Sequence, residues 1–360
     1  MMLHPLSSSS LPNLVRLFGR YGCAPRYLPR ATLMALACLL RQPLAILESV
    51  CYRRKLKVQT IDPPPIFIVG HWRSGTTHLQ NLLSQDPQFG RVTLLQASMP
   101  NDFLLMPEIV ADLLQRLLPK KRLMDEVPVS VDAPWEEEMA LASTGMLSFY
   151  HVSFFPKHIE KIFDRAVMLK GGDPNLVAEW RRQYLAFLSK VQFAQSNKQL
   201  LLKNPANTAR IPLLQAMFPG ARFIHIHRNP YKVFASTIHL YLSVQREWGL
   251  QSPNRNRVVQ HILRSYPLLM AAWIRDRDGL GAGHFTELSF SELQGRPLKT
   301  LQDIYTALGL DGFDAAQPYF QRYLTSQQDY RKNCLELSGQ ERQQASQQWH
   351  SIFDQLGYPI

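Results

Sequence analysis

The chain has 360 residues and a mass of 41.4 kDa, enough for one large α/β domain or two small ones. Apolar residues make up 46% and charged residues 19%, which excludes disorder of the chain as a whole. Four cysteines are widely spaced and form no CxxC pair. This spacing argues against a disulfide framework or a cysteine zinc site and suits a reducing compartment.

Lys and Arg outnumber Asp and Glu by 40 to 28, which gives a formal charge of +12. Such an excess favours an anionic partner: a nucleotide, a nucleic acid, a phospholipid surface or an acidic substrate. The sign of the charge does not choose among them. The histidines form no HxxxH or H-E-x-x-H pattern, so we predict no metal site.

Residues 1–61 are predicted to form an N-terminal helical segment. Their apolar run, residues 31–40, is about half the length that a bilayer requires and ends at Arg41-Gln42-Pro43. No small-residue cleavage site follows it, so it does not match a signal peptide. A core or docking helix of a soluble domain is the favoured interpretation. The basic cluster at 52–57 keeps peripheral binding to anionic lipid open.

A second domain, residues 62–360, is predicted to begin at Asp62-Pro63-Pro64-Pro65, which no helix can cross. The apolar, largely β-branched run at 66–69 is typical of a strand covered on both faces. A glycine-bearing loop at 70–77 and a helix at 77–84 follow it. The unit is therefore strand, loop and helix.

Three further units repeat this order along the chain. We expect strands at 199–203, 221–227 and 285–290, and helices at 207–218, from 230 to about 244, and at 297–308. This alternation predicts an α/β fold with a P-loop-type parallel sheet flanked by helices, and ligands at the carboxyl ends of the strands. A large, mostly helical insertion, at about 92–196, is expected to shape the substrate pocket.

The loop from Gly70 to Thr77 has the G-x-x-x-x-G spacing of a phosphate-binding loop, with a strand before it and a helix after it. Backbone N–H groups and the helix N-terminus can therefore cradle a phosphate. The lysine that a nucleoside triphosphatase needs after its second glycine is Thr76, and the cation lies upstream at Arg73. Phosphoryl transfer is disfavoured for this reason.

The sequence from Pro65 through Gly70-His71-Trp72-Arg73-Ser74-Gly75-Thr76-Thr77 to Leu79 resembles the phosphosulfate loop of sulfotransferases that use 3′-phosphoadenosine 5′-phosphosulfate (PAPS). It is most similar to the bacterial group with a G-H-x-R-S-G-T-T loop, which is related to the protein-tyrosine sulfotransferases. The resemblance implies that Arg73, Ser74, Gly75, Thr76, Thr77 and His78 bind the nucleotide, and that Arg73 also acts in catalysis.

A second motif supports the resemblance. Arg228-Asn229-Pro230, with Ser236 eight residues after the arginine, matches the segment that binds the 3′-phosphate in PAPS enzymes. Arg228 can fork onto a phosphate at the strand end while the Ser236 hydroxyl approaches from the helix. Lys203-Asn204-Pro205 corresponds to the K-x-P segment whose lysine stabilises the leaving group, although a solvated strand-end charge is the alternative for Lys203. A histidine common in the family is replaced by Asn207, which receives no catalytic role.

Sulfuryl transfer also needs a base for the proton of the acceptor. The candidates are Glu136, Glu137 and Glu138 at a predicted helix start, with Glu137 and Glu138 preferred. Acidic residues in a first helical turn are also ordinary capping chemistry, and that alternative carries equal weight. His71 and His78 are the fallback bases.

The resemblance implies a PAPS-dependent sulfotransferase, a transferase that moves a sulfuryl group to a hydroxyl or amine without a metal. The acceptor, a lipid, glycan, phenol or peptide, is not identified, and no nucleic-acid partner is predicted. The expected location is the cytoplasm, with peripheral contact with the inner face of a membrane as an open possibility. Two alternatives are a P-loop nucleotide kinase and a membrane-peripheral nucleotide-binding protein that has lost catalysis.

Overall fold

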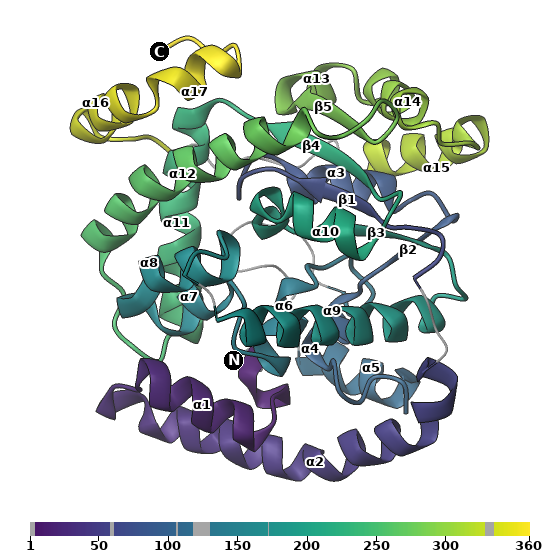
Figure 1. Ribbon diagram of the computed structural model, residues 1–360, viewed down its shortest axis with the longest axis vertical. Coiled ribbons are helices and arrows are strands. Elements are labelled where there is room, and N and C mark those ends of the chain that lie inside the picture. Colours follow the sequence, from purple (N-terminus) through teal and green to yellow (C-terminus); the bar gives the residue numbers. More distant parts are fainter. Residues whose placement is uncertain (1–3, 58–60, 106, 118–129, 172, 328–334) are drawn as a thin grey trace. The chain divides into compact units, whose positions relative to one another are not determined.

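A computed structural model describes residues 4–57, 61–105, 107–117, 130–171, 173–327 and 335–360 (Figure 1). The chain divides into two units, each built from segments that are distant in sequence. The first comprises Met1–Asp62, Arg91–Lys198 and Leu242–Asn254, and the second comprises Pro63–Gly90, Gln199–Tyr241 and Arg255–Ile360. The predicted N-terminal segment and the whole of the predicted insertion thus fall in the first unit.

The second unit is organised around a sheet with the strand order β2-β3-β1-β4-β5. The strands are β1 (Ile66–Val69), β2 (Phe89–Arg91), β3 (Gln199–Lys203), β4 (Arg222–His227) and β5 (Phe285–Ser289). The pairs β1–β3, β1–β4 and β4–β5 are all parallel. The predicted α/β fold class is therefore confirmed, and the sequence missed only the short strand β2.

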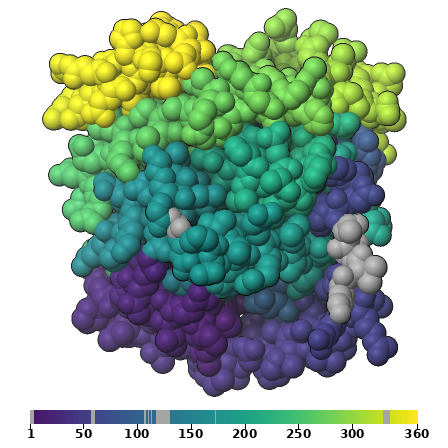
Figure 2. Space-filling view, viewed as in Figure 1, coloured from purple at the N-terminus to yellow at the C-terminus, as the bar shows by residue number. Residues whose placement is uncertain are grey.

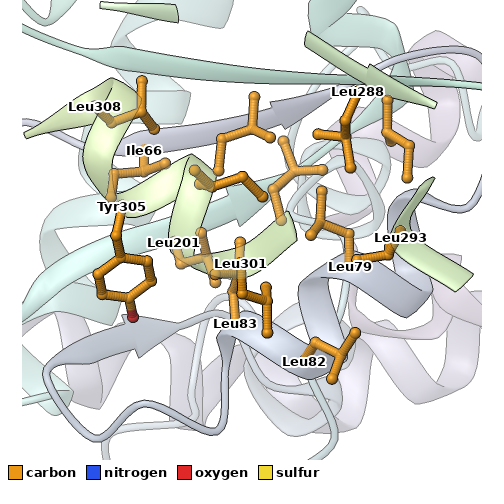
Figure 3. Packing of buried hydrophobic residues seen from close by; sticks show 14 of the residues in the cluster. Ile66, Leu79, Leu82, Leu83, Leu201, Leu288, Leu293, Leu301, Tyr305 and Leu308 are labelled. Carbon is orange, nitrogen blue, oxygen red and sulfur yellow. The ribbon is translucent and has the colours of Figure 1, made fainter. Parts of the chain in front are cut away.

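Side chains of the central strand alternate between two apolar layers. Ile66 and Ile68 point into a cluster with leucines of the helices on one face of the sheet, part of which Figure 3 shows. Phe67 points the other way and stacks on Phe223 of β4 with 5.4 Å between ring centroids. All four β1 residues are buried, so the continuous apolar run follows from coverage on both faces.

Helices of the second unit include all four that the sequence predicts, and several that it does not predict. They are α3 (Thr76–Leu83), α10 (Ile211–Met217), α11 (Pro230–Trp248), α12 (Arg255–Arg277), α13 (Phe290–Gly295), α14 (Pro297–Leu308), α15 (Phe313–Ser326), α16 (Gly339–Gln348) and α17 (His350–Gln355). The helix expected at 207–218 is wrong in its first turn, because a 3₁₀ segment (Pro205–Ala209) precedes α10. The long helix α12 and the helices α13, α15, α16 and α17 were not predicted.

The first unit is helical among its described residues, as the insertion was expected to be. Its elements are the 3₁₀ segments Pro5–Ser8, Pro25–Tyr27 and Pro156–His158, the π-helix Phe163–Val167, and α1 (Leu11–Tyr21), α2 (Leu28–Lys57), α4 (Leu94–Ser98), α5 (Pro107–Leu117), α6 (Glu138–Thr144), α7 (His151–Phe154), α8 (Ile159–Ile162) and α9 (Pro174–Ala194). Asp173 caps α9 by accepting a hydrogen bond from the Asn175 amide.

Helix α2 has 30 residues and is three times as long as the apolar run at 31–40 from which a helix was expected. It continues through Pro43 to Lys57, although Pro43 has no N–H to donate to the preceding turn. Within the described residues, the segment Pro25–Leu56 has the length and composition of a membrane-crossing helix, and only 17% of its most apolar 18-residue window is buried. Most of the apolar side chains of α2 are therefore exposed rather than buried in a core, whereas Ala31, Met34 and Cys38 pack inward.

Candidate active site

Three predicted site segments lie at one edge of the sheet. Gly70 follows β1, Lys203 ends β3, and Arg228 follows β4. Because β3 and β4 flank β1 in parallel, the carboxyl ends of all three strands meet there. The chain moves to opposite sides of β1 at this point, which is where open α/β sheets bind their ligands.

Gly70 begins the loop in a position that no other residue can occupy. Its φ is +138°, and a Cβ atom there would lie 2.3 Å from the Ile226 carbonyl oxygen. The Gly70 amide donates to Thr208 Oγ1 (2.8 Å), and the Thr208 hydroxyl donates back to the Gly70 carbonyl oxygen (3.2 Å). The loop therefore passes close to β4 and is hydrogen-bonded to the 3₁₀ segment after β3.

The second glycine makes room for an aromatic ring. Gly75 has a φ of +107°, and a Cβ atom there would meet the Phe290 ring at 2.3 Å. The next two residues, Thr76 and Thr77, open α3, so their amides lie in the first turn of the helix. Ser74 Oγ is buried and has no hydrogen-bond partner among the described residues. A loop with these features fits an anion that accepts from the Ser74 hydroxyl and the helix N-terminus.

Arg73 and Ser236 meet, although the resemblance assigned them to opposite ends of the nucleotide. Arg73 Nε donates to Ser236 Oγ over 2.8 Å. Arg73 also has a φ of +71°, in the left-handed region that costs a side-chain-bearing residue about 1 kcal/mol. The loop holds this arginine in a strained conformation, and a hydroxyl from α11 fixes the direction of its guanidinium group.

Phe290 connects the two phosphate motifs. The Arg228 guanidinium carbon lies 4.7 Å from the centre of the Phe290 ring, in cation–π geometry. His78 packs edge-on against the same ring, with 6.2 Å between centroids. Asn229 Oδ1 accepts from the Tyr231 amide (3.1 Å), so Asn229 caps α11. One ring thus contacts Gly75, His78 and Arg228.

Lys203 is buried at the strand end, with 3% of its surface exposed. This burial argues against the alternative of a solvated strand-end charge. Asn204 Oδ1 accepts from the Ala206 amide (3.0 Å) and shapes the turn after Lys203. Asn207, which stands at the family's histidine position, is fully buried, and its side-chain oxygen accepts from Arg210 Nη1 (3.1 Å).

The glutamates at 136–138 lie in the first unit and differ from one another. Glu138 begins α6, and its Oε1 atom accepts from the Phe149 amide over 2.6 Å. Glu137 is fully buried, and its Oε1 atom accepts from the Tyr184 hydroxyl over 2.9 Å. Glu136 is partly exposed. The successive positions point apart, as a helical start requires.

Burial raises the pKa of Glu137 to about 7, and the neighbouring Glu138 and Glu136 carboxylates add to the rise. The Tyr184 hydrogen bond opposes it, because it stabilises the ionised form. A carboxylate that exchanges its proton near neutral pH matches the requirement for a general base. Of the three glutamates, Glu137 is the one whose pKa is raised to near neutrality, and Glu138 accepts a backbone hydrogen bond.

His71 is a weaker base than Glu137, although both side chains are buried. It is 2% exposed, and burial lowers its pKa to about 4. Its Nδ1 atom pairs with the Trp72 carbonyl oxygen (2.8 Å), and its ring packs edge-on against Tyr266. These contacts indicate that His71 supports the conformation of the loop.

A pocket of about 360 Å³ lies within the first unit, and none of the residues predicted for the site lines it. Serines of the N-terminal segment and residues of α2, among them Arg41, line it. It is therefore not the predicted nucleotide site.

Two residues of the sheet edge escaped the sequence analysis. Thr208 fastens Gly70, and Phe290 links Gly75 with Arg228. Phe290 could have been found from the sequence, because it ends the strand predicted at 285–290, directly follows β5 and therefore lies at the same edge of the sheet. Nothing in the sequence around Thr208 marks it, because its partner is 138 residues away.

Comparison with known proteins identifies the chain. A family model described as "Sulfotransferase family" matches residues 64–315. Omega-hydroxy-beta-dihydromenaquinone-9 sulfotransferase Stf3 from Mycobacterium bovis is 33% identical over 328 residues, which cover 91% of this chain and 84% of that protein; Stf3 from Mycobacterium tuberculosis matches equally.

Solved structures show the same fold. Sulfotransferase STF9 from Mycobacterium avium superposes with a TM-score of 0.72 and 16% identity, covering 98% of both chains. Sulfotransferase STF1 from Mycobacterium tuberculosis gives a TM-score of 0.65 and 18% identity, covering 94% of this chain and 91% of that one. The alternatives of a nucleotide kinase and of an inactive binding protein are not favoured by any of these relatives. The chain belongs to the sulfotransferase family of enzymes.

Proposed function

We propose that this sulfotransferase uses PAPS as its sulfuryl donor and a lipid-like alcohol as its acceptor. Two observations support the proposal for the donor. The Phe290 ring contacts both phosphate motifs, at Gly75 and at Arg228, and the buried Ser74 hydroxyl has no hydrogen-bond partner among the described residues. Cations and amides arranged around one ring suit a ligand with phosphate groups at both ends. PAPS is such a ligand, and it would supply the transferable sulfuryl group.

Each residue at the sheet edge has a role in this scheme. The amides of Thr76 and Thr77, with the Ser74 hydroxyl, hold the 5′-phosphate, and Arg228 holds the 3′-phosphate. Ser236 aligns Arg73 and approaches the 3′-phosphate from α11. Arg73 and Lys203 place positive charge where negative charge develops on the departing phosphate oxygen.

The reaction itself exchanges one bond to sulfur for another. The acceptor oxygen bonds to sulfur while the bond from sulfur to the phosphate oxygen breaks, and the acceptor proton must leave. Glu137 accepts that proton in our proposal, because its raised pKa matches a base that works near neutral pH. The chain requires no metal in this scheme.

The relatives favour a lipid among the acceptor classes that the sequence left open. Stf3, named for an ω-hydroxylated dihydromenaquinone, shares 33% identity across most of both chains. We therefore propose a long isoprenoid carrying a terminal hydroxyl group. The free thiols of Cys23, Cys38 and Cys51 agree with action in the cytoplasm.

Nucleotide discrimination tests the proposed donor site. We expect 3′-phosphoadenosine 5′-phosphate to bind clearly more tightly than ADP or ATP, because only it offers Arg228 a 3′-phosphate. Arg228→Ala should cost about 2 kcal/mol, or about 30-fold in affinity, in calorimetric titration. Arg222→Ala is the matched control, since Arg222 lies at the opposite end of the same strand. Equal affinity of the parent protein for ADP would refute the assignment.

Acceptor class is tested by transfer of radiolabelled sulfate from PAPS. We expect geranylgeraniol to be sulfated at least tenfold faster than p-nitrophenol or a free hexose at equal concentration, because an apolar chain adds binding energy that can be used in the transition state. Preferential labelling of the phenol or the sugar would contradict the proposed acceptor and leave the donor site untouched.

A further inference from the structure

The exposed face of α2 is a continuous apolar surface, which we call the leucine face. It consists of Leu28, Leu33, Leu36, Leu39, Leu40, Leu44, Ile46, Leu47 and Val50, each between 38% and 70% exposed. These are nine of the fourteen large apolar side chains left exposed among the residues described. At 100° per residue they fall within an arc of about 160°, so they form one stripe along the helix.

The opposite face of α2 carries the polar anchors, which inverts the usual arrangement of a surface helix. Arg41 Nε donates to Asp102 Oδ2 (3.0 Å), and Glu48 forms an ion pair with Lys190. The Tyr52 hydroxyl donates to the Leu104 carbonyl oxygen (3.0 Å). Arg41 and Glu48 therefore face the protein, and the leucines face outward. Such anchoring on both sides of Pro43 explains how the helix continues past it.

Charge is concentrated in the same part of the chain. Residues 1–57 contain nine Lys and Arg residues and one acidic residue, Glu48, so they carry +8 of the chain's formal charge of +12. Arg53, Arg54 and Lys55 are exposed at the end of the leucine face, and Arg26 is exposed just before its start. Figure 2 shows residues of this part of the chain, in purple, at the molecular surface.

We propose that the leucine face docks α2 flat on the surface of an anionic phospholipid bilayer. Apolar side chains enter the acyl boundary, and the flanking basic residues contact the lipid phosphates. The helix lies in the plane of the membrane because its other face is anchored to the first unit from Arg41 to Tyr52. A second copy of the chain is a poorer occupant, since it would bring two segments of +8 together. This inference goes beyond the proposed reaction.

Vesicle sedimentation of the full-length protein, without nucleotide or acceptor, tests the proposal. We expect binding to vesicles of 30% phosphatidylglycerol in phosphatidylcholine, and at least tenfold weaker binding to phosphatidylcholine alone. The triple variant Leu36→Gln, Leu40→Gln, Leu47→Gln should lose at least tenfold in partition coefficient, because it removes apolar burial and leaves the charge unchanged. Arg53, Arg54 and Lys55 changed together to Gln should lose on the order of 100-fold on the anionic vesicles, and salt should reproduce this loss.

Matched controls carry the same changes elsewhere on the surface. Leu185→Gln, Tyr319→Gln, Ile360→Gln removes three exposed apolar side chains, and Lys161, Lys170 and Arg181 changed to Gln remove three exposed charges. Both controls should bind vesicles like the parent, and every variant should keep the parent's melting temperature within a few degrees. Unchanged binding of the leucine-face variant would overturn the proposal. So would a dimer in lipid-free solution, seen by light scattering, that this variant converts to a monomer.

Discussion

Replacing Arg73 with alanine is expected to reduce turnover by 10²- to 10³-fold while changing the dissociation constant of 3′-phosphoadenosine 5′-phosphate by less than tenfold. The guanidinium group is directed by Ser236 and held on a strained backbone, which is an arrangement suited to a group used in the transition state. Stopped assays of sulfate transfer to geranylgeraniol give kcat, and calorimetry gives the affinity. Normal kcat with a raised KM would instead make Arg73 a residue of ground-state binding.

Two further variants separate the guanidinium group from the strain of its backbone. Arg73→Gly should lose as much turnover as Arg73→Ala, yet it should be more stable by about 1 kcal/mol, because glycine adopts a φ of +71° without cost. Arg73→Lys keeps the positive charge but loses the planar guanidinium group with its paired N–H donors. We therefore expect its turnover to lie between those of the parent and of Arg73→Ala. A glycine variant with much higher turnover than the alanine variant would show that strain, rather than the lost group, limits the alanine enzyme.

The central strands were predictable because each combines a short apolar run with turn residues directly after it. Ile66–Val69 and Gln199–Lys203 are short apolar runs followed immediately by turn residues, and the structure confirms both to the residue. Their parallel pairing followed from the helices between them. The positions of Gly70, Lys203 and Arg228 at one sheet edge could therefore be inferred from the order of elements alone.

Contacts between distant segments were not predictable in the same way. The hydrogen bond from Arg73 to Ser236 spans 163 residues, and the contact of Phe290 with Gly75 joins residues that are more than 200 positions apart. The length of α2 was missed because Pro43 and Arg41 read locally as a helix end. Its continuation depends on partners such as Asp102 and Lys190, which lie far along the chain.

Changing Glu137 to glutamine is expected to lower turnover by about 10²-fold or more with little effect on nucleotide affinity. Glutamine keeps the shape of the side chain and can still accept from the Tyr184 hydroxyl, but it cannot take a proton. Glu138→Gln is the matched control, because its Oε1 atom serves the Phe149 amide. That change should cost stability, about 1 to 3 kcal/mol, rather than turnover. Melting temperature and kcat, measured on both variants, separate the two roles.

The pH dependence makes the assignment specific to Glu137. Its pKa of about 7 lies above the unperturbed value of 4.5, so the parent's turnover should rise with pH through about 7 as the carboxylate forms. Tyr184→Phe removes a hydrogen bond that favours ionisation, and it should move this limb to higher pH. A merely structural tyrosine would reduce stability and leave the limb in place.

Stability should follow the opposite trend with pH, because the folded state holds the Glu137 proton more tightly than the unfolded state does. Between pH 4.5 and about 7 the folded protein binds one proton more at this site, so its stability falls by about 1.4 kcal/mol per pH unit and then levels off. Glu137→Gln should abolish this component of the slope, measured by urea unfolding at several pH values.

If Glu136, Glu137 and Glu138 each retain full turnover as glutamine, the base lies elsewhere. His78 is then the better of the two histidine candidates, because it lies beside Phe290 whereas burial holds the pKa of His71 near 4.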